Sequence, residues 1–176
     1  ANSEGGSLEE YVKDLYAGTF DETDEDRRKE QIDKVFSYLG NDSNPPDAML
    51  RGSDAIEVKK IESAKADIQL NSSYPKCKLE STSSMISQDC RNAEESEWVK
   101  DLLYIVGHVK NKQLKSMFMV YGDDYAASEE VYLGVKQNIK DGILNTPGLE
   151  FVETEELGRI NMIDSLCITR LRVRGM

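Results

Sequence analysis

Residues 45–60 read PPDAMLRGSDAIEVKK, and this stretch predicts a β-hairpin. The turn-forming residues 51–54 separate two short apolar runs, which is the pattern of two strands joined by a tight turn. Because successive side chains of a strand alternate between faces, Glu57 and Lys59 point to the same side. Asp47 enters from the first arm and can approach them. Two carboxylates and one lysine on rigid strands can hold a divalent cation and position a water beside it.

The spacing of these residues resembles the PD-(D/E)XK nuclease motif. Pro46-Asp47 is followed by nine residues and then by Glu57-Val58-Lys59. The motif alone is short and appears often by chance, but the surrounding sequence is more specific. It is similar to the NgoPII-type family of type II restriction endonucleases. The segments that carry this resemblance are SNPPDAML (43–50), DAIEVKKIES (54–63), LNSSYPK (70–76), KDLLYIVG (100–107), VYGDDY (120–125), ELGR (156–159) and LRVRGM (171–176).

The resemblance implies an α/β fold with a PD-(D/E)XK restriction-endonuclease-like core, in which helices flank a central mixed β-sheet. We expect one such domain over residues 1–176. The implied activity is Mg²⁺-dependent hydrolysis of double-stranded DNA at a short GC-rich palindrome, GGCC, leaving 5′-phosphate and 3′-hydroxyl ends. A palindromic site implies a homodimer, and a cognate DNA methyltransferase would protect the host genome. Family members extend further at both ends, so we expect the chain to be a fragment or to lack a C-terminal segment.

The resemblance also assigns roles to the hairpin residues. Asp47 and Glu57 would bind Mg²⁺ through hard oxygens, with the Val58 carbonyl as a further ligand. Lys59 would orient the attacking water or stabilise charge in the transition state. The alternative is a solvated hairpin edge on which Glu and Lys pair across the strand. Asp54 falls at the turn, where Asp is favoured for backbone reasons, and we interpret it as structural.

Two groups of residues are candidates for DNA contact. A polar loop follows the catalytic strand, and its amide, hydroxyl and ammonium groups could meet phosphates or base edges. A second group lies near the C-terminus, where an arginine fork could read guanine. The alternatives are an ordinary polar loop and an exposed strand face with solvated charge. The candidates are Asn71, Ser73, Tyr74, Lys76 and Lys78 in the loop, and Arg159, Asn161, Arg170, Arg172 and Arg174 near the C-terminus.

The overall charge and its distribution along the chain give opposite indications about DNA binding. The net charge of -11 argues against nucleic-acid binding, since phosphate contact needs Lys and Arg. The charge is uneven, however, because residues 159–176 hold four arginines and one acid. No stretch has the apolar length of a membrane span, and the N-terminal residues lack a secretory signal, which favours the cytoplasm. Three widely separated cysteines indicate reduced thiols rather than disulfides.

Apolar periodicity predicts the remaining elements. We expect helices from Ser7 to about residue 17 and from about residue 26 to Leu39, weak helical character over 83–98, and a helix starting near Ser128. Strands are expected over 102–109, 116–121 and 167–173, the first two as a hairpin. Two rival functions remain: a repair or structure-specific nuclease on the same fold, and a non-catalytic binding module. A module of that kind has no need to keep Asp47, Glu57 and Lys59 together.

Overall fold

The computed structural model describes residues 6–41, 44–68, 74–154, 156–161 and 170–174. The chain divides into two compact units. Unit 1 consists of residues 1–66 and 77–124, and unit 2 consists of residues 67–76 and 125–176. Within the described residues, no helix has both the length and the apolar character needed to cross a membrane.

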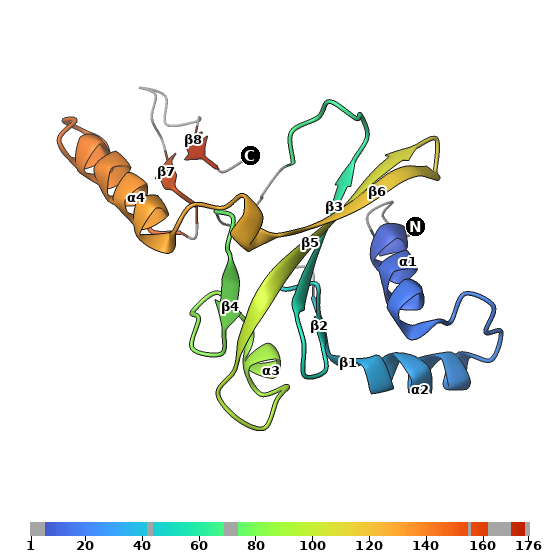
Figure 1. Ribbon diagram of the computed structural model, residues 1–176. Helices are drawn as coiled ribbons and strands as arrows, with labels where there is room; N and C mark the ends of the chain where they lie inside the picture. Colours follow the sequence, from blue (N-terminus) through green and yellow to red (C-terminus); the bar gives the residue numbers. More distant parts are fainter. Residues whose placement is uncertain (1–5, 42–43, 69–73, 155, 162–169, 175–176) are drawn as a thin grey trace. The chain divides into compact units, whose positions relative to one another are not determined.

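Unit 1 is built on a central mixed sheet, as the sequence predicts (Figure 1). Its strands run in the order β1-β2-β3-β5-β4, and β6 also pairs with β5. The pairing of β3 with β5 is parallel and the other pairings are antiparallel. The strands are β1 (Phe36–Leu39), β2 (Ala48–Leu50), β3 (Ala55–Ile61), β4 (Lys78–Glu80), β5 (Val99–Lys110) and β6 (Gln113–Tyr121).

Both predicted hairpins are confirmed. In the first, β2 pairs with β3 so that Ala48 lies opposite Ile56, and Gly52 occupies a turn position with φ of 66°. Glycine adopts this left-handed conformation without the steric cost that a Cβ brings. In the second hairpin, Asn111 and Lys112 have φ values of 53° and 61°, which is the geometry of a two-residue type I′ turn between β5 and β6.

Two helices pack against one face of this sheet. Helix α1 spans Gly6–Ala17, as expected, and α2 spans Glu25–Val35, with the Asp24 side chain accepting hydrogen bonds at its N-terminus. The core between helices and sheet contains Val12, Ile32, Phe36, Ala48, Ile56, Leu103 and Ile105. Burial of these apolar side chains is the main favourable contribution to folding of this unit.

The predicted C-terminal end of the second helix was wrong. The helix stops at Val35, and β1 (Phe36–Leu39) begins at the next residue. Phe36 and Tyr38 are buried and pair with residues of β2. Pairing with a strand distant in sequence outweighs the local helical spacing of the apolar residues, since tertiary context overrides a weak local preference.

The segment 83–98 forms less helix than expected. Only Gln88–Arg91 is helical, as α3, with the Ser87 side chain capping its N-terminus. Burial raises the pKa of the Cys90 thiol to about 11, which makes this cysteine a poor nucleophile. Cys90 and Cys77 are free thiols, in agreement with the predicted reduced state, and Cys167 lies outside the described residues.

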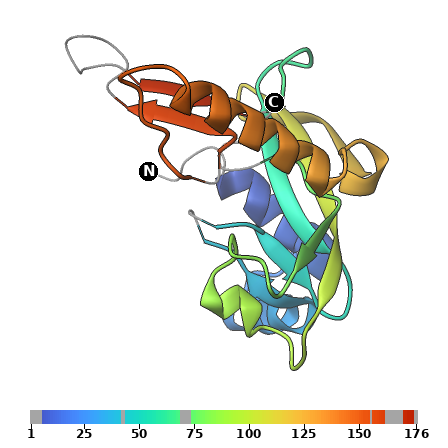
Figure 2. The same cartoon turned by 90° about the vertical axis from the view of Figure 1, so that its left-hand side faces the viewer.

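Unit 2 contains α4 (Glu129–Leu144) and the antiparallel pair β7 (Gly158–Asn161) and β8 (Arg170–Val173). Helix α4 packs against β7 (Figure 2). The predicted late strand is confirmed over β8, while residues 167–169 lie outside the described residues. The predicted apolar side of α4 is only partly buried. Val131 and Val135 are 53% and 42% exposed, whereas Ile143 is buried at the other end of the helix.

Candidate metal-dependent nuclease site

The hairpin brings together the three residues predicted to form the catalytic site. The β2–β3 register, continued by one residue from the Ala48–Ile56 pair, places Asp47 opposite Glu57. Asp47 Oδ2 accepts a hydrogen bond of 2.6 Å from the Val58 backbone N–H. Lys59 Nζ donates to Glu57 Oε1 at 2.5 Å. The side chains of Glu57 and Lys59 are mostly buried, with 15% and 20% of their surface exposed.

A close backbone approach fixes the position of Asp47. The Gly40 N–H donates to the Asp47 carbonyl at 2.8 Å. A Cβ atom at Gly40 would lie 2.5 Å from the Pro46 carbonyl oxygen and 2.7 Å from that of Asp47. Pro46 is fully buried on the other side of this contact. Only glycine therefore allows the end of β1 to approach the start of β2 this closely.

Both acids hold a proton more tightly than free carboxyl groups do, because the pKa of each is raised. Burial raises the pKa of Asp47, against the opposing effects of the Val58 N–H and the Lys59 charge. The pKa of Glu57 is raised by burial first and by the charge of Asp47 second. A pair of buried carboxylates that repel each other is the environment in which a bound cation is most favourable.

Glu57 also has an oxygen atom without a visible partner. Its Oε2 is buried and accepts no hydrogen bond from any residue that the structure describes. An unsatisfied buried oxygen is costly unless a ligand or water meets it. Oxygen ligands are those that Mg²⁺ and Ca²⁺ prefer. Asp47 and Glu57 therefore fit a divalent cation, with Oε2 as the available donor.

The site has two acids rather than three. Within the described part of the chain, no group of three or more His, Cys, Asp or Glu side chains is placed to hold a metal ion. Mg²⁺ commonly uses one or two carboxylates and completes its shell with water and substrate phosphate. The two-carboxylate arrangement thus suits a metal that the substrate helps to hold.

Two other acids of this unit, Asp54 and Glu10, have different surroundings. The backbone carbonyl of Asp54 accepts from the Leu50 N–H, in keeping with a turn role, and its side chain accepts from the Tyr121 hydroxyl at 2.9 Å. Glu10 contacts Lys13 at 2.8 Å and Arg28 at 2.9 Å.

The loop candidates for DNA contact that the structure describes are held by acidic side chains. Tyr74 is buried, stacks on Tyr132 with a centroid distance of 4.8 Å, and donates to Glu129 at 2.7 Å. Lys76 Nζ lies 3.2 Å from Glu129 and 4.3 Å from the Tyr74 ring centroid. Lys78 pairs with Asp101 at 2.9 Å. Asn71 and Ser73 lie outside the described residues.

The C-terminal candidates gather on a residue that the sequence analysis missed. Glu156 is only 5% exposed, and its carboxylate accepts hydrogen bonds from Arg172 and from Arg174, the latter at 2.8 Å. Burial opposes ionisation of Glu156, but the two guanidinium groups outweigh it and hold its pKa below the usual value. No sequence signal separates Glu156 from the exposed acids, because its arginine partners lie 16 and 18 residues away.

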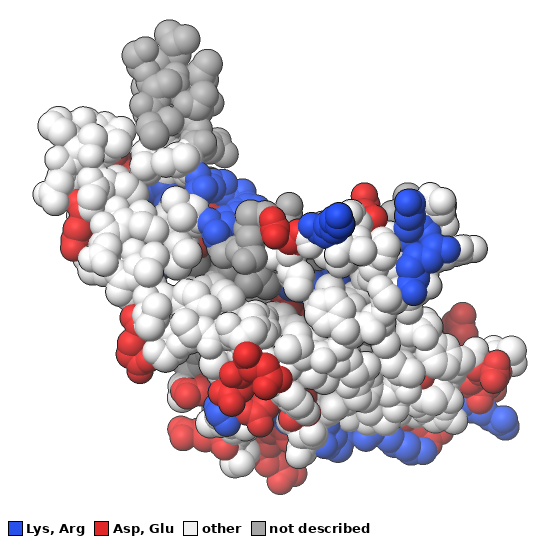
Figure 3. All heavy atoms as spheres, turned by 45° about the horizontal axis from the view of Figure 1, so that its top comes forward, with Lys and Arg blue, Asp and Glu red and all other residues white. Residues whose placement is uncertain are grey.

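The other C-terminal candidates lie on the paired strands β7 and β8. Arg159 donates to the Asn161 side chain at 3.3 Å, and Arg170 lies opposite Asn161 in the strand pairing. Figure 3 shows local groups of basic side chains on the surface, with acidic side chains beside some of them. The local grouping of positive charge is consistent with the uneven charge of the sequence.

Comparison with known proteins places the chain in a family. The model of the NgoPII restriction endonuclease family matches residues 1–176. The chain belongs to the NgoPII restriction endonuclease family. It is 58% identical over 177 aligned positions to the type II restriction enzyme NgoPII of Neisseria gonorrhoeae. The alignment covers 100% of this chain and 63% of that relative, so the chain spans less than two thirds of the relative's length. No solved structure gives a significant match.

Proposed function

We propose that this chain carries the catalytic site of a type II restriction endonuclease that hydrolyses phosphodiester bonds of double-stranded DNA at a specific sequence. The observation that carries the proposal is the meeting of Asp47, Glu57 and Lys59 on one hairpin, with a buried unsatisfied oxygen on Glu57. Membership of a restriction endonuclease family supports the same activity. The core would then be of the PD-(D/E)XK type, within one functional domain over residues 1–176.

Asp47 and Glu57 would hold Mg²⁺ in this proposal. The bound ion would polarise the scissile phosphate and lower the pKa of a bound water. Asp47 is kept in place by the Val58 N–H, so one of its oxygens is oriented before substrate arrives. Glu57 is anchored through Oε1 by Lys59, which leaves Oε2 to face the ion. Pre-orientation of this kind lowers the cost of reaching the reactive geometry.

Lys59 has two tasks in the proposed reaction. Its ammonium balances the charge of Glu57 before substrate binds. During the reaction it would orient the attacking water and stabilise the negative charge that develops on the phosphate oxygens. Attack of water on phosphorus breaks the bond to the 3′ oxygen, giving a 5′-phosphate and a 3′-hydroxyl end. The proton lost by the water passes to solvent or to the leaving oxygen.

DNA recognition completes the proposal. Arg159, Asn161, Arg170, Arg172 and Arg174 are the candidate base readers, because an arginine can donate two hydrogen bonds to guanine. The proposed target is a GC-rich palindrome, GGCC. A two-fold symmetric target favours a homodimer. The proposed place of action is the cytoplasm. A cognate methyltransferase would modify the same sequence. The loop candidates Asn71, Ser73, Lys76 and Lys78 would contact the DNA backbone. The buried Tyr74 would support the loop through its hydrogen bond to Glu129.

The test is digestion of unmethylated plasmid DNA with Mg²⁺ or with EDTA, followed by sequencing of the product ends. We expect discrete fragments that require Mg²⁺ and that end at one sequence. Lys59→Met should abolish cutting, whereas Lys60→Met is the matched control, since Lys60 is the next residue of the same strand and points to the other face. Cutting at DNA junctions or lesions alone would instead identify a structure-specific nuclease. Absence of both cutting and DNA binding would refute the proposal.

A further inference from the structure

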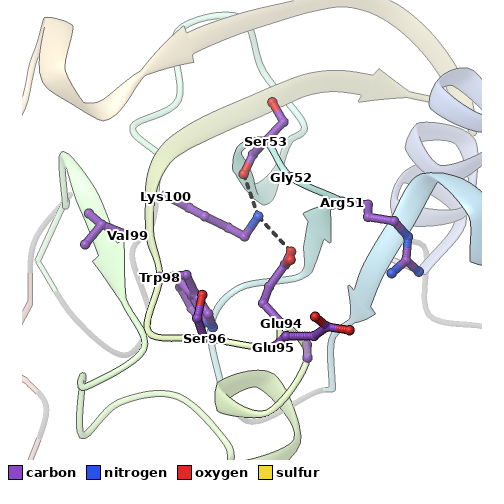
Figure 4. A pocket seen from close by; sticks show the side chains of 10 residues that line it. Arg51, Gly52, Ser53, Glu94, Glu95, Ser96, Trp98, Val99 and Lys100 are labelled. Atoms are coloured by element: carbon purple, nitrogen blue, oxygen red, sulfur yellow. Dashed lines mark hydrogen bonds and ion pairs between the residues drawn. The ribbon is translucent and has the colours of Figure 1, made fainter.

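A buried lysine lies behind the turn of the catalytic hairpin. Lys100, near the start of β5, is only 5% exposed. Its ammonium donates to the carbonyl oxygen of Leu50 at 2.9 Å. It also donates to the carbonyl oxygen of Ser53 at 2.7 Å and lies 3.0 Å from a carboxylate oxygen of Glu94 (Figure 4). An ammonium group has three N–H donors, so these three acceptors account for all of them.

Glu94 extends this contact to two further parts of the sheet. Its carboxylate accepts a hydrogen bond of 2.7 Å from the Ser37 hydroxyl of β1 and another from the Gly52 backbone N–H of the turn. Burial opposes its ionisation, but the hydrogen bonds from Ser37 and Lys100 outweigh burial and keep the pKa of Glu94 below its usual value. The Lys100–Glu94 pair thus joins β1, β5 and the hairpin turn.

The turn held by this pair sets the register of the hairpin. The Ser53 N–H donates to the Leu50 carbonyl at 3.2 Å, so that carbonyl receives both the turn hydrogen bond and Lys100. In a hairpin the turn determines which residues of the two arms face each other. A shift of one residue would move Glu57 to the opposite face from Asp47.

The buried charges of this pair act on the turn in particular. Removing two charges from water is costly, and apolar residues of similar size often give equal or greater stability. The charges at Lys100 and Glu94 meet carbonyl groups and an N–H of the turn itself, which apolar side chains would leave without partners. The pair also lines a pocket of about 470 Å³ together with Arg51 and Trp98. This pocket has space for the larger guanidinium group of an arginine in place of Lys100.

We propose that Lys100 and Glu94 are positioning residues for the metal site, which hold the turn so that Asp47 and Glu57 meet in the correct register. They act through the hairpin and are not catalytic residues. The inference rests on the proposed function, because it assumes that Asp47 and Glu57 bind a divalent cation.

The test measures Mn²⁺ binding to the full chain without DNA, by electron paramagnetic resonance. Lys100→Met keeps the aliphatic part of the side chain and removes the charge. We expect its Mn²⁺ affinity to fall roughly 10- to 100-fold, as is typical when groups that orient metal ligands are removed. Lys100→Arg retains a cation that can donate to both turn carbonyls, and it should recover most of the affinity. Glu94→Gln should lower the Mn²⁺ affinity in the same way, and it tests the proposal if Lys100→Met does not fold.

Two controls separate positioning from loss of stability and from failure of the proposed function. Ile32→Val destabilises the same unit through the core of α2, and its Mn²⁺ affinity should equal that of the wild type. If folded Lys100→Met and Glu94→Gln proteins bind Mn²⁺ as tightly as the wild type, the positioning role is overturned. It is also overturned if Ile32→Val lowers the Mn²⁺ affinity as much as they do. Neither result affects the proposed metal site. Asp47→Asn reports on the metal site itself. If the wild type binds Mn²⁺ no better than Asp47→Asn does, the proposed metal site fails and the positioning role fails with it.

Discussion

Replacement of Gly40 by alanine should damage the proposed active site although Gly40 has no side chain to take part in it. The added Cβ would lie 2.5 Å from the Pro46 carbonyl oxygen and 2.8 Å from the Asp47 Cα. Real Cβ atoms essentially never approach other atoms closer than 3.0 Å. The Pro46 oxygen must therefore move by about 0.5 Å, and the obstructing atoms belong to a backbone that cannot rotate away. Asp47, the next residue, moves with it.

Two quantities should change together. Overpacking of this size costs about 1–3 kcal/mol in the free energy of unfolding. A displacement of about 1 Å in an active site can cost roughly 100-fold in rate, so half that displacement predicts a loss of roughly 10-fold or more in kcat/KM. The assay is cleavage of a labelled duplex with Mg²⁺, with thermal unfolding of the same samples.

The matched control is Gly134→Ala on the exposed surface of α4. No atom lies within 4 Å of a Cβ built there. Alanine in a helix is more stable than glycine by about 0.5–1 kcal/mol, so this variant should be slightly more stable and equally active. Wild-type cleavage and stability in Gly40→Ala would refute the argument that the close approach at Gly40 positions Asp47.

Three further predictions concern single residues. Because burial raises the pKa of Asp47, the folded protein without metal holds a proton more tightly than the unfolded chain does, and its stability falls as pH rises from about 4 through the raised pKa. In EDTA, the free energy of unfolding of Asp47→Asn should therefore rise relative to that of the wild type as pH increases. Urea unfolding measures both proteins, and a difference that does not change with pH would contradict this prediction. Glu156→Gln should cost about 1–3 kcal/mol in urea unfolding, because it removes the negative charge and turns one of the two acceptor oxygens that face the guanidinium groups into a donor. The exposed Glu150→Gln should change stability by less than about 0.5 kcal/mol, and equal effects of the two substitutions would refute the buried role of Glu156. Ile105→Ala should cost about 2–5 kcal/mol by calorimetry, since Ile105 is 0% exposed, and a loss below about 1 kcal/mol would place it outside the core.

The hairpin and the meeting of its three polar side chains could be predicted from the sequence because their signals are local. The turn residues, the alternation of Glu57 and Lys59 and the position of Asp47 all depend on a stretch of sixteen residues, 45–60. The turn at Asn111-Lys112 was predictable for the same reason, since a two-residue connection between apolar runs favours a hairpin.

The missed features depend on contacts between residues distant in sequence. Phe36–Leu39 has apolar residues at helical spacing, and only its pairing with β2 makes it a strand. Glu156 and Lys100 are charged residues that sequence reasoning places at the surface, since Glu and Lys are rarely buried. Lys100 donates to carbonyl groups 50 and 47 residues away, and Glu156 accepts from arginines 16 and 18 residues away. Periodicity carries no information about such partners.

The most direct test of the proposed metal site is diffraction from crystals of the protein soaked in Mn²⁺, measured at a wavelength where manganese scatters anomalously. Our account predicts one strong anomalous peak at bonding distance from Asp47 and from Glu57 Oε2, absent in crystals of Asp47→Asn. Peaks elsewhere only, in a protein that cuts DNA with Mn²⁺, would show that the metal chemistry uses other residues and would contradict the site assigned to the hairpin.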